Sequence, residues 1–467
     1  MMKRNFLSKL FQASLMCCLA VILTGCDELF DAIDNPIQTS ISMATSDVKL
    51  AVGQTNQRKA TTASPATVVY ASADPAIATV DGNGVVTGVA SGTTTITASV
   101  AAVDGWTAAS ASYKVIVGDG SSSSATPNPG ASTPTEMKNT PFTVEALEAG
   151  TKVEFYEVGD CAKNIEYSTD GGATWTAGST ASPGVSVPLA NAGDKVMFRG
   201  DNSSYATLSA YNYVNSDKPV KVYGNIMSLI KKTGFETLTT LTDAYAFRKL
   251  FKDNDKLTDA SGLLLPAETL TAWCYSDMFN QCVNLTAAPE LPATTLADYC
   301  YYYMFRDCDA LTTAPTLPAT EMKESCYSGM FNSCNTLTTA PELPATTLAD
   351  GCYNSMFMSC TSLTSVPDEL PVTDLKSSCY GSMFFGCISL TTAPKLPATT
   401  LADYCYSNMF YGCTSLTEAW IKAEFNYSNC MMMFEGCTAT GVLHGSLTHA
   451  SSWNSNQPSN WTVQANY

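Results

Sequence analysis

Pairs of cysteines recur through the second half of the chain, and paired thiols are side chains that can do chemistry. One copy reads CYSNMFYGCTSL, from Cys405 to Leu416, with its two cysteines eight residues apart. Thiolates at a fixed spacing can bind zinc, form disulfides or act as a redox couple, and buried thiols can simply fill a core. The period is 26 residues, with slips to 27 and 25, because the first cysteines stand at positions 274, 300, 326, 352, 379, 405 and 430 and the second at 282, 308, 334, 360, 387, 413 and 437.

The spacing of these cysteines argues against a metal site. Zinc-binding cysteines are usually about two to four residues apart, whereas seven residues separate the members of each pair, and the repeats contain no histidine. Within one unit, a helix of this length would hold the two Cα atoms about 12 Å apart, beyond the roughly 7 Å limit for a disulfide. Between neighbouring units a stacking distance of about 5 Å would permit disulfides, but each series has seven cysteines, an odd number. The sequence therefore favours buried free thiols and predicts no metal and no cofactor. Disulfides between units and metal or redox chemistry are the alternatives.

The apolar residues of each unit indicate the elements that position these cysteines. Counting the first cysteine as position 0, apolar residues stand at positions 0, 1, 4, 5, 8 and 11. At about 100° per residue they occupy one helical face about 140° wide, and strand alternation fails. We therefore predict a short helix, ended by the prolines of the AP-x-LP segment, and then a short extended segment. Such a unit predicts an α/β solenoid of about eight coils over residues 221–445.

The repeated unit, C-Y-x-x-M-F-x-x-C-x-x-L-T-x-A-P-x-L-P-A-T-T-L-A-D, resembles the 26-residue bacterial surface repeat of BspA-type leucine-rich-repeat surface proteins. The resemblance runs from Ala246 to Cys437 and includes a degenerate first unit, in which Ala246 and Asn254 stand in the two cysteine positions. It implies adhesion to host matrix proteins or to other bacteria. Leucine-rich repeats place Asn or Cys at one buried ladder position, so the resemblance also implies a structural ladder of Cys282, Cys308, Cys334, Cys360, Cys387 and Cys413.

A tyrosine follows the first cysteine of most units and lies at the edge of the predicted helical face. Its phenol could reach solvent there and contact a partner, or its ring could pack in the core, as we expect for the nearby Met-Phe pair. The candidate binding stripe consists of Tyr275, Tyr301, Tyr327, Tyr353, Tyr380 and Tyr406.

The first residues of the chain predict export. Three cations precede a mostly apolar stretch at 13–23, which is too short for a stable membrane anchor. The stretch ends in Leu23-Thr24-Gly25-Cys26, which resembles the lipobox of bacterial lipoproteins. The resemblance implies a signal peptide at 1–25, a Cys26 that carries acyl chains such as palmitate, and a lipid-anchored tether at 26–39.

Asp27 and Glu28 follow the lipobox directly. Acidic residues at this point resemble the surface-export signal of some Gram-negative phyla, although elsewhere an aspartate there directs inner-membrane retention. No other apolar run approaches about 18 residues, so the lipid would be the only membrane attachment. We expect an outer-membrane protein that is lipid-anchored and exposed on the cell surface.

Residues 40–117 contain short strands between turn signals, and Asp81-Gly82-Asn83-Gly84 predicts a hairpin turn. Several strands in one short segment predict a β-sandwich. The stretch ASADPAIATVDGNGVVTGVASGTTTITA strongly resembles the group 2 bacterial immunoglobulin-like domain, which implies a stalk or spacer. Residues 118–140 are rich in Ser, Pro, Gly and Thr and read as a linker.

Residues 141–220 predict a second small β domain, and residues 446–467 form a C-terminal tail. Within the β domain, Ser168 to Trp175 (STDGGATW) fits the Asp-box pattern of sialidases. In that family the motif stabilises a hairpin and is not catalytic. This chain has one copy and no arginine cluster, so we expect a structural hairpin.

Composition narrows the range of functions. The formal net charge is −17 with 25 Lys and Arg residues, which argues against nucleic acid and anionic membrane surfaces as partners. Only two histidines occur, and no nucleophile elbow, phosphate loop or zinc motif is present. We therefore expect no enzyme but a surface lipoprotein that uses its repeats for adhesion to host or bacterial ligands. The alternative is a glycan-binding lipoprotein that works with an outer-membrane polysaccharide-uptake system.

Overall fold

The computed structural model describes residues 39, 41–42, 48–51, 55–58, 60–62, 64–103, 106–118, 134–370, 372–446, 448–454 and 457–467. The predicted signal peptide, the lipid site at Cys26 and most of the predicted linker lie outside the described residues. The chain divides into two compact units between residues 131 and 132, and each is described by itself.

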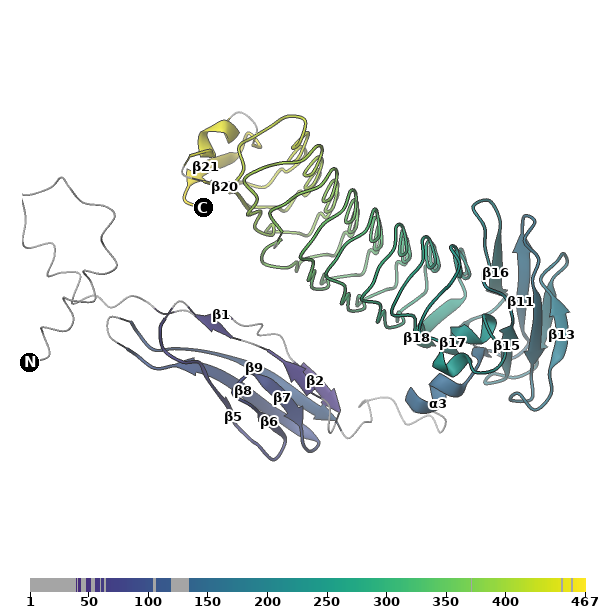
Figure 1. Ribbon diagram of the computed structural model, residues 1–467. Helices are drawn as coiled ribbons and strands as arrows, with labels where there is room; N and C mark the ends of the chain where they lie inside the picture. The colour runs from purple at the N-terminus through teal and green to yellow at the C-terminus, as the bar shows by residue number, and fades with distance from the viewer. Residues whose placement is uncertain are drawn as a thin grey trace, which may run out of the picture. The chain divides into compact units, whose positions relative to one another are not determined.

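The first unit is a β-sandwich (Figure 1). One sheet has the strand order β2-β9-β8-β5 and the other β3-β7-β6, with a small β1-β4 pair beside them. Fully buried Val86, Ile96 and Val115 fill the space between the sheets. The predicted turn joins β6 to β7, where Asp81 Oδ1 accepts the backbone N–H of Val85 at 2.8 Å. The strands are β1 (Ile41–Ser42), β2 (Val48–Ala51), β3 (Thr55–Gln57), β4 (Thr61–Thr62), β5 (Val69–Ser72), β6 (Ala78–Val80), β7 (Val85–Gly88), β8 (Gly92–Val100) and β9 (Ala109–Gly118).

The second unit begins with a short helix and two further sheets. Their strand orders are β13-β12-β15-β10-β17-β18 and β14-β11-β16, and Phe142, Phe155 and Phe198 pack between them. Because β18 belongs to the first repeat unit and pairs in parallel with β17, the β domain and the repeats share one sheet and one core. The elements are α3 (Pro134–Asn139), β10 (Phe142–Ala146), β11 (Thr151–Val158), β12 (Asn164–Ser168), β13 (Thr176–Ser179), β14 (Val185–Leu189), β15 (Lys195–Gly200), β16 (Tyr211–Ser216), β17 (Val220–Asn225), η1 (Ile226–Leu229), η2 (Phe235–Thr237) and β18 (Leu257–Leu264).

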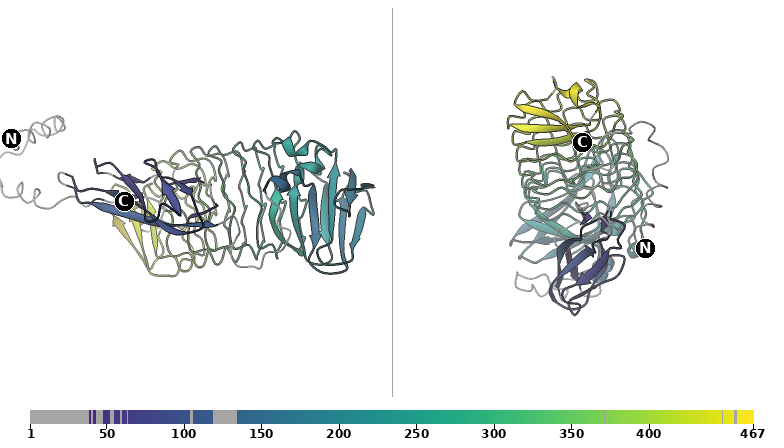
Figure 2. Two further views of the ribbon diagram at one scale, coloured as in Figure 1. Left: turned by 90° about the horizontal axis from the view of Figure 1, so that it is seen from below. Right: turned by 90° about the vertical axis from the view of Figure 1, so that its left-hand side faces the viewer.

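The repeats form coils that stack on one another, and Figure 2 shows them as successive rungs between the β domain and the C-terminal strands. The predicted α/β solenoid is wrong, because the described residues of the repeats contain no α-helix. Each coil has a chain of β-turns on one side and isolated parallel bridges on the other, such as Thr269 to Thr295 and Thr339 to Ser365. We call this structure the repeat array.

Backbone conformation explains the absence of helix. Residues at positions −1, 3 and 7 of a unit take left-handed backbone angles; in the second coil these are Trp273, Asp277 and Gln281, with φ of 61°, 55° and 63°. Alternate N–H groups close tight turns, and the others donate to the next coil, as Tyr275 does to the carbonyl of Cys300 at 2.9 Å. An α-helix would use all these groups within one segment. The apolar residues therefore follow a four-residue turn period, two inward and two outward, rather than a helical one.

The C-terminal residues continue the strand side beyond the last coils. Strands β19 (Glu418–Ile421), β20 (Gly441–Gly445) and β21 (Trp461–Ala465) form a parallel sheet, with η3 (Ala450–Trp453) between the last two. Trp453 is fully buried, and its Nε1–H donates to the carbonyl of Ala423 at 3.0 Å. The predicted tail is therefore part of the folded array.

The last coil is one residue out of the predicted register. Tyr406 donates its N–H to the carbonyl of Asn429, as Tyr380 does to that of Cys405. Asn429 therefore takes the first-cysteine position, and Cys430 takes the tyrosine position. The first cysteine series continues only to Cys405.

Candidate functional site

The second cysteine of each unit is a buried hydrogen-bond donor. Cys360 Sγ donates to the carbonyl of Phe331 in the preceding coil at 3.0 Å. Burial raises the pKa of Cys360 to about 12, which keeps the thiol protonated and able to donate. The same bond, 3.0–3.1 Å long, recurs at Cys282, Cys308, Cys334, Cys360, Cys387 and Cys413, all of them free and fully buried.

Asn254 takes the equivalent place in the degenerate first coil. Its Nδ2 donates to the carbonyl of Val214 in β16 at 3.2 Å, and its Oδ1 accepts the N–H of Lys256 at 3.1 Å. At the junction with the β domain, the Asn254 amide therefore donates to a backbone carbonyl as the thiols do in later coils. Among the described residues, no group of three or more His, Cys, Asp or Glu side chains is placed to hold a metal ion.

The predicted tyrosine binding stripe is wrong. The six rings are only 0–1% exposed, and successive rings stack 5.7–6.3 Å apart as a column through the core. The reason is the turn period, which directs positions 0 and 1 inward together, whereas a helix would place position 1 at the edge of its face. No phenol of Tyr275, Tyr301, Tyr327, Tyr353, Tyr380 or Tyr406 is available to a partner.

A different set of aromatic rings lies on the surface of the first coils. Tyr245, Trp273 and Tyr299 occupy position −1 of three successive coils, and all three are half-buried. Ring centres are 6.3 Å apart between the first two and 4.2 Å apart, with the planes at 3°, between the last two. Tyr302 contacts both Trp273 and Tyr299 edge-on, and Tyr303 lies beside it. We call these five residues the surface aromatic row.

The backbone of the surface aromatic row is strained. Tyr245, Trp273 and Tyr299 have φ of 62°, 61° and 58°. A bulky side chain in this left-handed region costs about 1–2 kcal/mol. Three later coils have a smaller residue in the same position, Ser325, Gly351 and Ser378, also with positive φ. The fold itself therefore does not require aromatic residues here, and observed strain of this kind points to function.

Two arginines contact the rings of the row, and one glycine leaves room for the ring of Tyr303. The Arg248 guanidinium lies 5.7 Å from the ring centres of both Tyr245 and Trp273, and it donates to the carbonyl of Leu208 in the β domain at 2.8 Å. Arg306 lies 5.2 Å from the ring of Tyr303. Beneath that ring is Gly329, where a Cβ would come within 1.9 Å of a ring carbon. The result is a rigid surface of Trp, Tyr and Arg side chains.

Sequence reasoning missed this row because it looked for a residue type conserved in every unit. The signal was the opposite one: aromatic residues in a few units, at positions that other units fill with serine or glycine. Only the turn conformation shows that these positions face outward.

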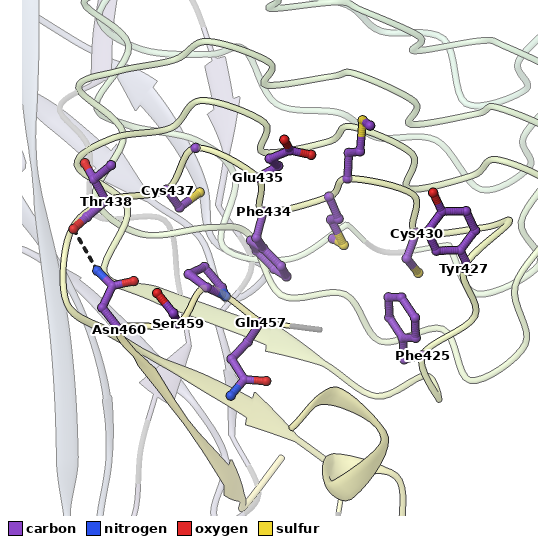
Figure 3. Close-up of a pocket in the computed structure, with 14 residues that line it drawn as sticks. Phe425, Tyr427, Cys430, Phe434, Glu435, Cys437, Thr438, Gln457, Ser459 and Asn460 are labelled. Atoms are coloured by element: carbon purple, nitrogen blue, oxygen red, sulfur yellow. Dashed lines mark hydrogen bonds between the residues drawn. The ribbon is translucent and has the colours of Figure 1, made fainter. Parts of the chain in front are cut away.

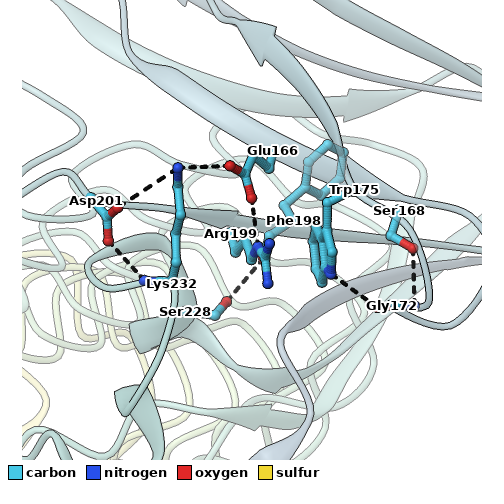
Figure 4. Close-up of polar contacts among 9 residues, drawn as sticks. All are labelled: Glu166, Ser168, Gly172, Trp175, Phe198, Arg199, Asp201, Ser228 and Lys232. Atoms are coloured by element: carbon cyan, nitrogen blue, oxygen red, sulfur yellow. Dashed lines mark hydrogen bonds and ion pairs between the residues drawn. The ribbon is translucent and has the colours of Figure 1, made fainter.

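The Asp-box hairpin joins β12 to β13 and is a structural feature, as predicted (Figure 4). Asp170 accepts the hydroxyl of Thr174 at 2.5 Å, the N–H of Thr174 at 2.9 Å and the hydroxyl of Ser168 at 2.7 Å, and these bonds hold the pKa of its carboxyl well below the usual range. Trp175 Nε1 donates to the carbonyl of Gly172 at 3.0 Å. The turn thus uses its own polar groups.

The charged residues beside the hairpin also pair with one another (Figure 4). Glu166 accepts Lys232 Nζ at 2.8 Å and Arg199 Nε at 2.7 Å, which lowers the pKa of its carboxyl. The Arg199 guanidinium covers the ring of Trp175 at 3.9 Å from its centre. Since the cluster is internally satisfied, it leaves little for a ligand.

A groove of about 520 Å³ opens at the turn side of the last coil (Figure 3). Apolar residues line its floor, among them Phe425, Cys430 and Phe434, and Gln457 and Asn460 stand at its rim. The groove exists because no further coil stacks here and because Cys430 is smaller than the tyrosine of other coils.

Comparison with known families assigns the N-terminal part of the chain. Residues 37–110 match the bacterial Ig-like domain (group 2) family, in agreement with the β-sandwich and with the predicted resemblance. The match does not extend to the repeats, and a search of curated proteins found no match. In the described part of the chain, no helix has the length and apolar character needed to cross a membrane.

Proposed function

We propose that the protein is a cell-surface binding protein. In this proposal a lipid on Cys26 anchors the chain to the outer membrane, the Ig-like domain acts as a spacer, and the repeat array presents the surface aromatic row to a protein ligand on a host or bacterial surface. The BspA-type resemblance supports adhesion. The observation that carries the proposal is the row itself, in which Tyr245, Trp273 and Tyr299 occupy left-handed positions that three later coils fill with serine or glycine.

The composition of the row favours a protein as the ligand. Trp, Tyr and Arg are the residues most enriched in the energetic centres of protein interfaces. Stacking holds the rings before binding, so little side-chain entropy is lost when a partner arrives. The facing surfaces of Trp273 and Tyr299 cover each other at 4.2 Å, which leaves the ring edges for contact.

Replacing Trp273 by Ser tests the proposal. Ser325 and Ser378 occupy the same position in later coils with positive φ, so the fold should tolerate serine here, and the melting temperature of the variant checks this. The binding of the mature ectodomain to immobilised fibronectin, laminin, collagen and whole bacterial cells should be measured first. For any probe that binds, loss of a central aromatic residue, worth about 2 kcal/mol, should weaken binding about 30-fold.

The matched control is Tyr404→Ser. Tyr404 has the same position in its coil and a φ of 55°, but it is 51% exposed and lies outside the row. This variant should bind like the parent chain. Equal losses in both variants, or adhesion that resides in the isolated Ig-like domain, would contradict the proposal.

A further inference from the structure

A second surface feature lies on the strand side of the array, where a depression of about 360 Å³ spans three coils. Trp420 of β19 forms part of its lining. The bridges Thr392–Glu418 and Leu396–Ile421 show that this coil is one residue shorter here, so Trp420 alone takes the place that Pro394 and Lys395 have in the preceding coil. Proline also occupies this position in other units, as Pro289, Pro315, Pro341 and Pro367.

One face of the Trp420 indole rests on the C-terminal strands. The His444 ring in β20 stacks against it, with ring centres 4.9 Å apart and an angle of 11° between the planes. His444 is held in turn by Asn466 Oδ1 at 2.8 Å and Glu418 Oε1 at 3.1 Å. Trp420 lines the depression, whereas His444 is not among its lining residues. The ring is therefore a rigid aromatic platform that is backed on one face.

Polar groups surround this platform. Lys395 Nζ lies over the indole, 6.0 Å from its centre, and the exposed side chain of Asp368 also lines the depression. Neither side chain forms an ion pair with another described residue. The exposed hydroxyl residues Thr364, Ser365 and Thr392 complete the polar lining.

We infer that this depression binds a pyranose ring of a glycan. A sugar has an apolar C–H face that packs on an indole, and it has hydroxyl groups that both donate to a carboxylate and accept from an ammonium group. Asp368 and Lys395 are free to serve these two roles beside Trp420. The volume lies at the lower end of the range for small-ligand sites and suits one or two sugar rings.

Other ligand classes fit less well. A nucleotide would bring several negative charges next to the carboxylate of Asp368, with only the one ammonium group of Lys395 to balance them. An apolar peptide side chain would bury the hydroxyl residues and both charges without partners. The inference goes beyond the proposed function, because this site lies on the strand side of the last full coils and shares no residue with the surface aromatic row.

The test is binding of the mature ectodomain to an array of neutral hexose and N-acetylhexosamine oligosaccharides, followed by titration calorimetry with those that bind. We expect at least one to bind, and Trp420→Ala to weaken its binding at least 30-fold, while Trp420→Phe keeps it within tenfold of the parent. Asp368→Asn changes an exposed side chain that the fold does not use, and it should weaken binding about tenfold. Melting temperatures identify any variant that misfolds.

Trp273→Ser separates the two sites, since it should leave sugar binding unchanged, just as Trp420→Ala should leave protein adhesion unchanged. Absence of binding to every sugar would overturn the inference. Sugar binding that survives both Trp420→Ala and Asp368→Asn would do the same.

Discussion

Cys360 allows the hydrogen bond of the thiol ladder to be separated from its packing. Its Sγ is fully buried in the middle of the array and donates to the carbonyl of Phe331 at 3.0 Å. That carbonyl also accepts the N–H of Cys334 at 3.1 Å, so loss of the thiol leaves it with one partner. All three replacements, by Ala, Ser and Asn, remove the sulfur. Ser and Asn keep a hydrogen-bond donor, and Ala does not.

The structure gives the expected magnitudes. Cys360→Ala removes one buried heavy atom, about 1 kcal/mol by comparison with a methylene group, and leaves a small void. Because the Phe331 carbonyl keeps one hydrogen bond, the lost bond adds about 0.5–1.5 kcal/mol, at the lower end of the range for such losses. The total is about 1.5–2.5 kcal/mol. Cys360→Ser keeps a donor and should cost about 1 kcal/mol. Cys360→Asn should cost less than alanine, since Asn254 already uses an amide in the equivalent place.

The assay is equilibrium urea unfolding followed by far-UV circular dichroism in the presence of a reductant. Repeat arrays need not unfold in one step, so the variants are compared by the midpoint and slope of the transition of the array. Alanine and serine variants of equal stability would show that the thiol contributes only volume. An asparagine variant less stable than the alanine variant would refute the equivalence of thiol and amide at this position.

Two further predictions concern the thiols and the anchor. Burial raises the pKa of Cys274 to about 12 and of Cys379 to about 11, from an ordinary value of 9.0. Because the pKa values are raised in the folded state, the contribution of the thiols to stability is fully present below pH 9 and is lost as the pH rises toward 12. The loss is about 1.4 kcal/mol per pH unit for each thiol that ionises only in the unfolded chain. Of the fifteen free cysteines, all but Cys161 lie in the repeats, which leaves fourteen whose losses add together. The array should therefore unfold steeply between about pH 9 and 11 in a circular-dichroism titration. An array intact at pH 11 would contradict this. Cys26→Ser should release the protein from membranes or leave it unprocessed, and a variant that remains with the outer membrane after a carbonate wash would disprove the lipid anchor.

Local signals in the sequence were sufficient for much of the N-terminal unit. Val, Ile and Thr runs predicted strands, and Asp81 and Gly84 predicted the hairpin turn, because each depends on residues close in the chain. In the repeats, the period and the buried positions were also predictable. Met278, Phe279, Cys282 and Leu285, at positions 4, 5, 8 and 11, are all fully buried.

The conformation of the repeats was not predictable from the apolar pattern alone. Positions 0, 1, 4, 5 and 8 fall on one helical face, but they also repeat every four residues, and the two interpretations differ in where position 1 points. The discriminating evidence was in the polar residues. Gly351, Ser355 and Ser359 also recur every four residues, and all three adopt positive φ. Glycine tolerates that conformation freely, whereas serine is less suited to it, so a chain of turns required neighbouring coils to supply the remaining hydrogen bonds.

Departures from the repeat carry more functional information than the repeat itself. In a stacked array each inward position is constrained by the coils on both sides, so cysteine, tyrosine, methionine and phenylalanine recur for reasons of packing. An outward position has no such constraint, and the residue that fits the backbone best is expected there. Trp273 and Tyr299 occupy left-handed positions that three later coils fill with serine or glycine, and Trp420 stands where the preceding coil has Pro394 and Lys395. None of these three side chains is explained by the core, and Trp273 and Trp420 each lie beside a cationic side chain. The proposed protein and glycan contacts account for both sets of departures, and they lie on two separate faces of the array.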